Sequence, residues 1–171
     1  ILLASNARET DSLFLDTCDV PIVVLDNHSL HLDLANVNIA NAQGIYLAVE
    51  HLFSLGHRDI AYLAPRSSSP NFVERYNSFI NSVSMHPEMS GSFGQIYLVD
   101  KGNYTEFISG LIYALSEEGH MPSAFVCAND WYAYACISAL RSHGLRVPDD
   151  VSVVGFDDIP LASMSSPPLT T

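Results

Sequence analysis

The stretch VSVVGFDDIPLA, residues 151–162, predicts both a fold class and a place for a binding site. Its first six residues are almost entirely apolar, which is typical of a strand buried on both faces of a parallel sheet. Two adjacent carboxylates, Asp157 and Asp158, follow at once, and then Pro160. Ligands of open parallel sheets bind beyond the carboxyl ends of the strands. The carboxylates therefore either bind a ligand there or accept backbone N–H groups in the turn before the proline.

Short apolar strands alternate with segments of helical period along the rest of the chain. We expect strands over residues 1–4, 21–26, 37–40, 59–64, 95–99, 124–128 and 151–156. We expect helices over residues 41–55, 72–83, 104–116 and 129–143. Asn41 and Asn129 are placed to cap the first and last of these helices, and Gly56 and Gly144 to end them. The alternation predicts an α/β fold with mainly parallel sheets covered by helices on both faces.

The charge balance excludes some classes of partner. Seven Lys and Arg residues stand against 19 Asp and Glu residues, which gives a net charge of −12. Nucleic-acid affinity depends on cations that displace phosphate counterions, so we do not expect this chain to bind DNA or an anionic membrane surface itself. No apolar run approaches the roughly 20 residues that span a bilayer, and no signal-peptide pattern is visible. Because the chain opens and closes abruptly, we expect it to be part of a longer protein.

Neither cofactor nor metal is expected. The three cysteines form no CxxC motif, and free thiols fit a reducing cytoplasm. His51 and His57 lie near one helix end but lack a third ligand at suitable spacing. The chain carries no GxGxxG, GxxxxGK[ST], GxSxG or HExxH motif. Adjacent aspartates at a strand end point to different sides, so an acid/base pair would need a distant partner, and we do not expect an enzyme.

Polar residues follow three predicted strands and could converge on one ligand. Asp157 follows one strand, Asn129 follows another, and Arg75 comes after the loop that leaves a third. A carboxylate, an amide and a guanidinium together suit a polyol or a heterocycle, and Tyr104 and Phe72 could supply an apolar face.

Each of these polar residues also has an interpretation without a ligand. Asn129 could serve only as a helix cap. Asp130, in the first turn of the same helix, is favoured there by the helix dipole alone. Arg75 could simply pair with Glu74 or another surface acid.

Five segments carry a resemblance that covers nearly the whole chain: VPIVVLDN (20–27), VEHLFSLGHRDIAYLA (49–64), ERYNSF (74–79), PSAFVCANDWYAYACISALRSHGLRVPDDVSVVGFDDIPLA (122–162) and PPLTT (167–171). In this order they resemble the effector-binding core of the lactose-repressor/galactose-repressor family of bacterial transcriptional regulators. The resemblance implies a periplasmic-binding-protein-like type I fold, with two Rossmann-like lobes joined by three crossover strands. It implies that residues 1–57 form part of the N-terminal lobe and residues 58–171 most of the C-terminal lobe.

The same resemblance implies a function. The chain would be the small-molecule-sensing and dimerisation region of a cytoplasmic, homodimeric regulator, whose effector is a sugar or a purine-like molecule. DNA would be bound only through a helix-turn-helix domain outside this chain. The alternative is a periplasmic sugar-binding protein of a transporter, which has the same two lobes.

Three residues match the family's effector contacts position by position: Arg75, Asn129 and Asp157. Tyr104 resembles the aromatic residue that stacks on the effector. Weaker candidates are Phe72, Asn71 and Gln43. Asp158 would serve the turn or contacts between the lobes. The chain departs from the family pattern at Ala40, where an aspartate is common, and at Ser78, where a glycine is common.

Overall fold

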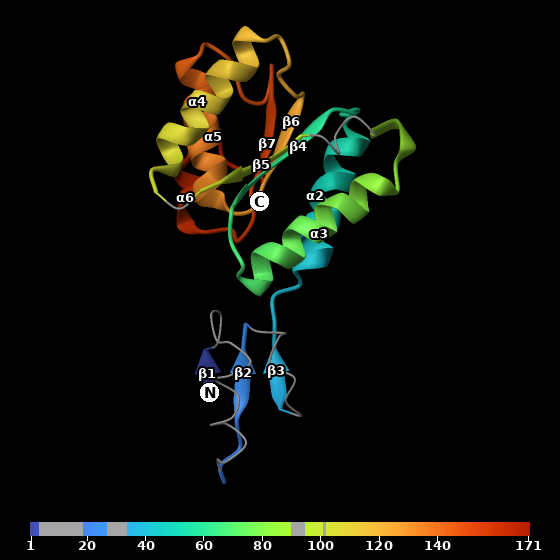
Figure 1. Cartoon of the computed structure of the whole chain (residues 1–171), viewed down its shortest axis with the longest axis vertical. Helices are drawn as coiled ribbons and strands as arrows, with labels where there is room; N and C mark the ends of the chain where they lie inside the picture. The colour runs from blue at the N-terminus through green and yellow to red at the C-terminus, as the bar shows by residue number, and fades with distance from the viewer. Residues whose placement is uncertain (4–18, 27–33, 90–94, 101) are drawn as a thin grey trace.

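Two parallel sheets form the framework of the molecule. The computed structural model describes residues 1–3, 19–26, 34–89, 95–100 and 102–171 (Figure 1). The first sheet has the order β1–β2–β3, with strands Leu2–Leu3, Val23–Leu25 and Ala35–Val37. The second sheet has the order β5–β4–β6–β7, with strands Ile96–Val99, Ile60–Pro65, Ala124–Cys127 and Ser152–Val154. Every strand pair is parallel, so the predicted α/β fold with parallel sheets is confirmed.

Helices cover both faces of the second sheet, as Figure 1 shows. Their bounds are α2 Asn41–Ser54, α3 Pro70–Ser84, α4 Tyr104–Glu117, α5 Asp130–Ser142 and the short α6 Pro160–Met164. Side chains of successive strand residues point to opposite faces. Thus Tyr62 of β4 packs with the buried residues of α2 and α3, whereas Leu63 packs with those of α4 and α5. The near-continuous apolar strands are explained by this double coverage.

Some predicted boundaries and caps are wrong. The strand expected at residues 37–40 lies at 35–37, because the chain turns into α2 and Gly44 donates its N–H to the Ala40 carbonyl. Asn41 does not cap α2: Ala40 occupies that place without a side-chain cap, and Asn41 lies buried inside the helix. The cap at Asn129 is confirmed, since its side chain accepts the Tyr132 N–H at 3.1 Å.

The predicted helix ends are confirmed at both glycines. Gly56 and Gly144 have φ values of 94° and 79°, a left-handed conformation that glycine adopts without strain. After α2, the N–H of Gly56 donates to Phe53 and that of His57 to Leu52, which satisfies the last carbonyls of the helix.

The helix α2 packs with the second sheet, although it follows the first sheet in the chain. Its residues Ile45, Val49 and Leu52 are buried in the same core cluster as Ile60 and Val126. The chain therefore passes from one sheet to the other through residues 38–40. The lobe boundary that the family resemblance implies after residue 57 stays a prediction.

The end of the chain returns beside β7. Thr170 forms a parallel bridge with Val154, and the Gly155 N–H donates to the Thr170 carbonyl at 2.8 Å. The PPLTT segment thus lies along the outer edge of the second sheet, next to the carboxyl end of β7.

His57 joins the amino ends of two strands of the second sheet. Its Nδ1 lies 2.9 Å from Ser123 Oγ and its Nε2 lies 3.0 Å from Ser152 Oγ. A neutral imidazole offers one donor and one acceptor, and the hydroxyls can complement both. Partial burial, followed by the proximity of His51, lowers the pKa of His57.

Because this pKa is lower in the folded than in the unfolded state, the unfolded chain binds more protons just below its usual value of 6.5. We expect His57 to contribute stability above that pH and to lose it as the pH falls. Urea unfolding at pH 7.5 and pH 5.5 should show a smaller pH dependence for His57→Gln than for the wild type. His120→Gln, at an exposed position, serves as the control. Equal pH dependence in all three proteins would contradict the role of His57.

Candidate functional site

Polar groups converge where β6 and β7 end. Arg75 reaches this point from the second turn of α3, and its residue is only 3% exposed. Its Nε donates to Asn41 Oδ1 at 2.7 Å, one terminal nitrogen donates to the Ala128 carbonyl at 2.6 Å, and the other donates to Asp157 Oδ1 at 3.0 Å. A buried guanidinium needs such partners because it cannot lose its proton. Arg75 therefore ties α2, β6 and the loop after β7 together.

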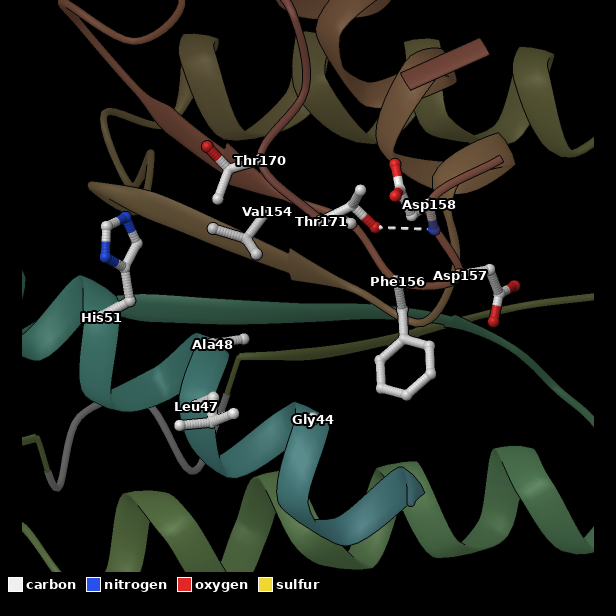
Figure 2. A pocket seen from close by; sticks show the side chains of 11 residues that line it. Gly44, Leu47, Ala48, His51, Val154, Phe156, Asp157, Asp158, Thr170 and Thr171 are labelled. Carbon is white, nitrogen blue, oxygen red and sulfur yellow. Dashed lines mark hydrogen bonds between the residues drawn. The ribbon is translucent and has the colours of Figure 1, made fainter. Parts of the chain in front are cut away.

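The two adjacent carboxylates have different tasks. Figure 2 shows the Asp157 and Asp158 side chains pointing away from each other. Both residues have positive φ values, 103° and 48°, which turn the chain sharply after β7. Asp157 pairs with Arg75, whereas the Asp158 N–H donates to the Thr171 hydroxyl oxygen at 3.3 Å. Thus Asp157 belongs to the site and Asp158 to the turn.

The Asp157 carboxylate is held in a partly desolvated position. Burial raises its pKa, and the charges of Asp130 and Asp26 act in the same direction. The Arg75 guanidinium opposes this shift without cancelling it. Desolvation together with the two neighbouring carboxylates thus outweighs the pairing with Arg75. Any further hydrogen-bond donor brought by a ligand would favour the ionised form of Asp157.

Asp130 shapes the loop that carries Asp157. Its side chain is 1% exposed in a position that a ligand would have difficulty reaching. Oδ1 accepts the Phe156 N–H at 2.9 Å and the Thr171 hydroxyl at 2.6 Å, and Oδ2 accepts the Ile159 N–H at 2.8 Å. The helix dipole alone, which the sequence offered as an explanation for this residue, is therefore an incomplete account.

Aromatic rings flank the site on two sides. The Phe156 ring lies 3.7 Å from the Arg75 guanidinium carbon, and the Phe72 ring lies 5.7 Å from it. A Cβ at Gly44 would approach the Phe156 ring to 2.5 Å, so glycine is required beneath the ring. Tyr104 stacks on Tyr132 with ring centroids 5.2 Å apart.

The structure brings most of the predicted site residues together. Arg75 and Asp157 are paired, Phe72 lies against Arg75, and Asn129 directly follows the carbonyl that Arg75 binds. Tyr104 is linked to Asn129 indirectly: its ring stacks on Tyr132, and the Tyr132 backbone N–H donates to the Asn129 side chain. Gln43 is exposed on the first turn of α2 and shares no hydrogen bond with the other candidates among the described residues.

Sequence reasoning missed two polar contributors. The sequence suggests that Asn41 is a helix cap, yet Asn41 lies four residues before Ile45 on the apolar face of α2, and this spacing is the signal for its burial. The sequence indicates only a strand end at Asp26, whereas in the structure its Oδ1 accepts the Asn71 amide N–H at 2.7 Å. Ser78, where the family commonly has glycine, is accommodated because its hydroxyl donates to the Glu74 carbonyl of its own helix.

A cavity of about 360 Å³ adjoins the site and lies between α2 and β7. Figure 2 shows Leu47 and Ala48 on one side of it, Val154 and Thr170 on the other, and Asp157 at its rim. Among the residues that the structure describes, no three His, Cys, Asp or Glu side chains are grouped to hold a metal ion. None of the helices in the described part of the chain is long and apolar enough to cross a membrane.

The model for the periplasmic binding protein-like domain matches residues 49–171, which is most of the chain. The chain belongs to this family. Among curated relatives, it is 37% identical over 153 residues to the HTH-type transcriptional regulator MalR of Streptomyces coelicolor, covering 89% of this chain and 44% of the relative. The chain thus spans about half the length of the curated relatives it matches.

Solved structures agree with this assignment. A sugar-binding transcriptional regulator of the LacI family from Escherichia coli, complexed with phosphate, matches with a TM-score of 0.79 and 28% identity, over 94% of this chain and 57% of that one. A regulatory protein of the LacI family from Chloroflexus aggregans matches with a TM-score of 0.84 and 27% identity, over 98% and 59%. The resemblance to the lactose-repressor/galactose-repressor family is confirmed.

Replacing Asp130 tests how the Asp157 loop is held. Asp130→Asn exchanges one buried acceptor for a donor and leaves an N–H group or the Thr171 hydroxyl without its partner. We expect a loss of about 1–3 kcal/mol in the free energy of unfolding, measured with urea. Asp149→Asn, an exposed change of the same kind, should cost less than about 0.5 kcal/mol. An Asp130→Asn protein as stable as the wild type would contradict the role assigned to this carboxylate.

Proposed function

We propose that this chain is the small-molecule-sensing and dimerisation region of a bacterial DNA-binding transcriptional regulator, which works in the cytoplasm and catalyses no reaction. The observation that carries the proposal is the Asp157 carboxylate at the carboxyl end of β7. One of its oxygens accepts from the buried Arg75, and 34% of its side chain stays exposed. A carboxylate fixed in this way accepts strong hydrogen bonds from the hydroxyl or N–H groups of a ligand.

The neighbouring groups favour a sugar or a purine-like effector. The Asn129 Oδ1 atom is engaged in the helix cap, which leaves the amide N–H₂ group to donate to a ligand. The Tyr104–Tyr132 stack and the Phe72 ring offer apolar faces that suit a sugar ring or a base. Gln43, exposed on the first turn of α2, is a further candidate. The E. coli neighbour is described as sugar-binding, which supports the same ligand class.

The effector would act by favouring one arrangement of two lobes over another. A ligand shifts such an equilibrium only by its difference in affinity for the two arrangements. In the regulator, this shift would change the placement of two DNA-binding heads and hence their affinity for an operator. The HTH-type name of the MalR relative supports a helix-turn-helix as the DNA-binding part. The net charge of −12 of this chain is unfavourable for contact with the phosphates of DNA, which supports a DNA-binding part outside it.

An exposed apolar surface supports the homodimer. Trp131 and Tyr134 of α5 are 53% and 44% exposed, and Met164 of α6 is 79% exposed. Tyr134 and Met164 line the same surface hollow. Apolar side chains gathered in this way are typical of surfaces that bind another protein, and a second copy of the chain is the partner we propose.

A sugar-binding protein of a transporter would use a similar cleft, so the site alone does not discriminate between the two classes. The relatives named as transcriptional regulators favour the sensor. The discriminating feature of the whole protein is its N-terminal segment: a helix-turn-helix indicates the regulator and a signal peptide indicates the transporter protein.

A ligand screen tests the site. Pentoses, hexoses and purine bases would be added singly, and the rise in unfolding temperature measured. For the compound that stabilises the wild type, we expect Asp157→Asn to weaken binding by about tenfold or more, because the amide still accepts from Arg75 but loses a ligand-facing acceptor. Asp158→Asn is the matched control and should bind as the wild type does.

Equal affinity of the two variants would contradict the assignment of Asp157. A compound that binds to Asp157→Asn normally but is no longer converted to a product would instead indicate an enzyme.

A further inference from the structure

A continuous hydrogen-bond chain runs from the first sheet to the candidate site. It begins at Asp26, at the end of β2, whose Oδ1 accepts from Asn71 Nδ2 at 2.7 Å. Asn71 Oδ1 accepts from Asn41 Nδ2, also at 2.7 Å. Asn41 Oδ1 accepts from Arg75 Nε at 2.7 Å, and Arg75 donates onward to Asp157 at 3.0 Å. The path joins four segments that are distant in sequence: the end of β2, the helices α2 and α3, and the loop after β7.

The direction of every bond in the chain is determined by chemistry. A guanidinium can only donate, so the Asn41 side chain must turn its oxygen to Arg75. The Asn41 amide nitrogen then faces Asn71, so the Asn71 side chain must accept this hydrogen bond with its own oxygen. The Asn71 nitrogen is left pointing outward, and it requires an acceptor, which the Asp26 carboxylate supplies. Neither asparagine amide can flip without breaking at least two hydrogen bonds at once.

The polar side chains in the middle of this path are buried. Asn41 is 0% exposed, Asn71 is 8% exposed and Arg75 is 3% exposed. A buried polar group that loses its hydrogen-bond partner costs free energy. A change in one side chain of the path therefore shifts the hydrogen bonds of the next side chain. Glu74 adds a second acceptor for Asn41 Nδ2 at 2.9 Å, which strengthens the fixed orientation of that amide.

The outer end of the path lies on a different sheet from the inner end. Figure 1 shows β1, β2 and β3 standing apart from the helices and strands of the second sheet. Asp26 has a φ of 63°, and its N–H donates to the Val37 carbonyl of β3 at 2.9 Å, so its position follows the first sheet. Displacement of the first sheet would therefore pull on Asn71 before it affected Asp157 directly.

We propose that Asp26, Asn71 and Asn41 are positioning residues that couple the placement of the first sheet to the orientation of Arg75 and Asp157. The inference rests on the proposed function for its purpose, since it makes effector affinity at Asp157 depend on the arrangement of the two sheets. The coupling itself can be tested without an effector. Loss of the Asp26–Asn71 hydrogen bond should make the loop of residues 155–159 more mobile.

An exchange of donor and acceptor tests this coupling. Asn71→Asp places a carboxylate against the Asp26 carboxylate, and their repulsion breaks the chain. Adding Asp26→Asn restores it, because the introduced amide donates to the introduced carboxylate, which still accepts from Asn41. The net charge of the double variant equals that of the wild type. Asn77→Asp, the same change on the exposed face of α3, is the matched control.

The measurement is backbone hydrogen–deuterium exchange of residues 155–159 in the full-length protein without ligand. We expect exchange about tenfold faster in Asn71→Asp and wild-type rates in the double variant and in Asn77→Asp. Wild-type exchange in Asn71→Asp, or no recovery in the double variant, would overturn the proposal. If Asn71→Asp does not fold, Asp26→Ala is measured instead, and wild-type exchange in that variant overturns it equally.

Ligand affinity provides a separate readout. For the sugar or purine that binds most tightly in the screen, Asp26→Ala should weaken binding although Asp26 lies outside the Asp157 loop. Unchanged ligand affinity combined with faster exchange of residues 155–159 would support the coupling along the hydrogen-bond path but overturn its link to ligand binding. If no compound in the screen binds, only the proposed function is contradicted. The coupling is tested independently, because hydrogen–deuterium exchange is measured without ligand.

Discussion

The buried guanidinium of Arg75 is the constraint on which the site depends. A permanent charge that is 3% exposed must be satisfied by fixed acceptors, and three come from separate elements: α2, the end of β6 and the loop after β7. The Phe156 ring, 3.7 Å away, covers the charge. That ring in turn requires Gly44 beneath it. A single side chain thus explains why an asparagine, a glycine and a phenylalanine stand where they do.

The carboxyl end of β7 shows how a sharp turn is made to present a functional group. Asp157 must adopt a φ of 103°, which is unfavourable for a residue with a side chain. Asp130 compensates by accepting two backbone N–H groups of this loop and the Thr171 hydroxyl. The adjacent carboxylates of the GFDD segment therefore divide the work: the first pairs with Arg75 and faces solvent, and the second has its N–H group bonded to the returning PPLTT segment.

The sequence was sufficient for the features that follow from local pattern. Apolar strands and helical periods predicted the parallel α/β arrangement, and Asn129 and the two glycines were correctly placed at helix ends. Asn41 shows the limit of local reasoning. Its position before a helix suggested a cap, but the partner that decides its role, Arg75, is 34 residues away. The Arg75–Asp157 pair spans 82 residues. The strand-end pattern and the family resemblance both suggest that these residues converge, but neither predicts that they pair directly with each other. Asp26 carried no local signal for its bond to Asn71.

The most direct measurement of the central claim is the ligand affinity of Arg75→Lys, determined by calorimetry with the sugar or purine that stabilises the wild type most. Lysine keeps the positive charge but cannot reach three acceptors in a fixed plane. We expect the variant to retain its far-ultraviolet circular dichroism spectrum and to bind about tenfold or more weakly, because Asp157 is no longer held. A folded Arg75→Lys protein with wild-type affinity would contradict the account, since binding would then not depend on the buried guanidinium.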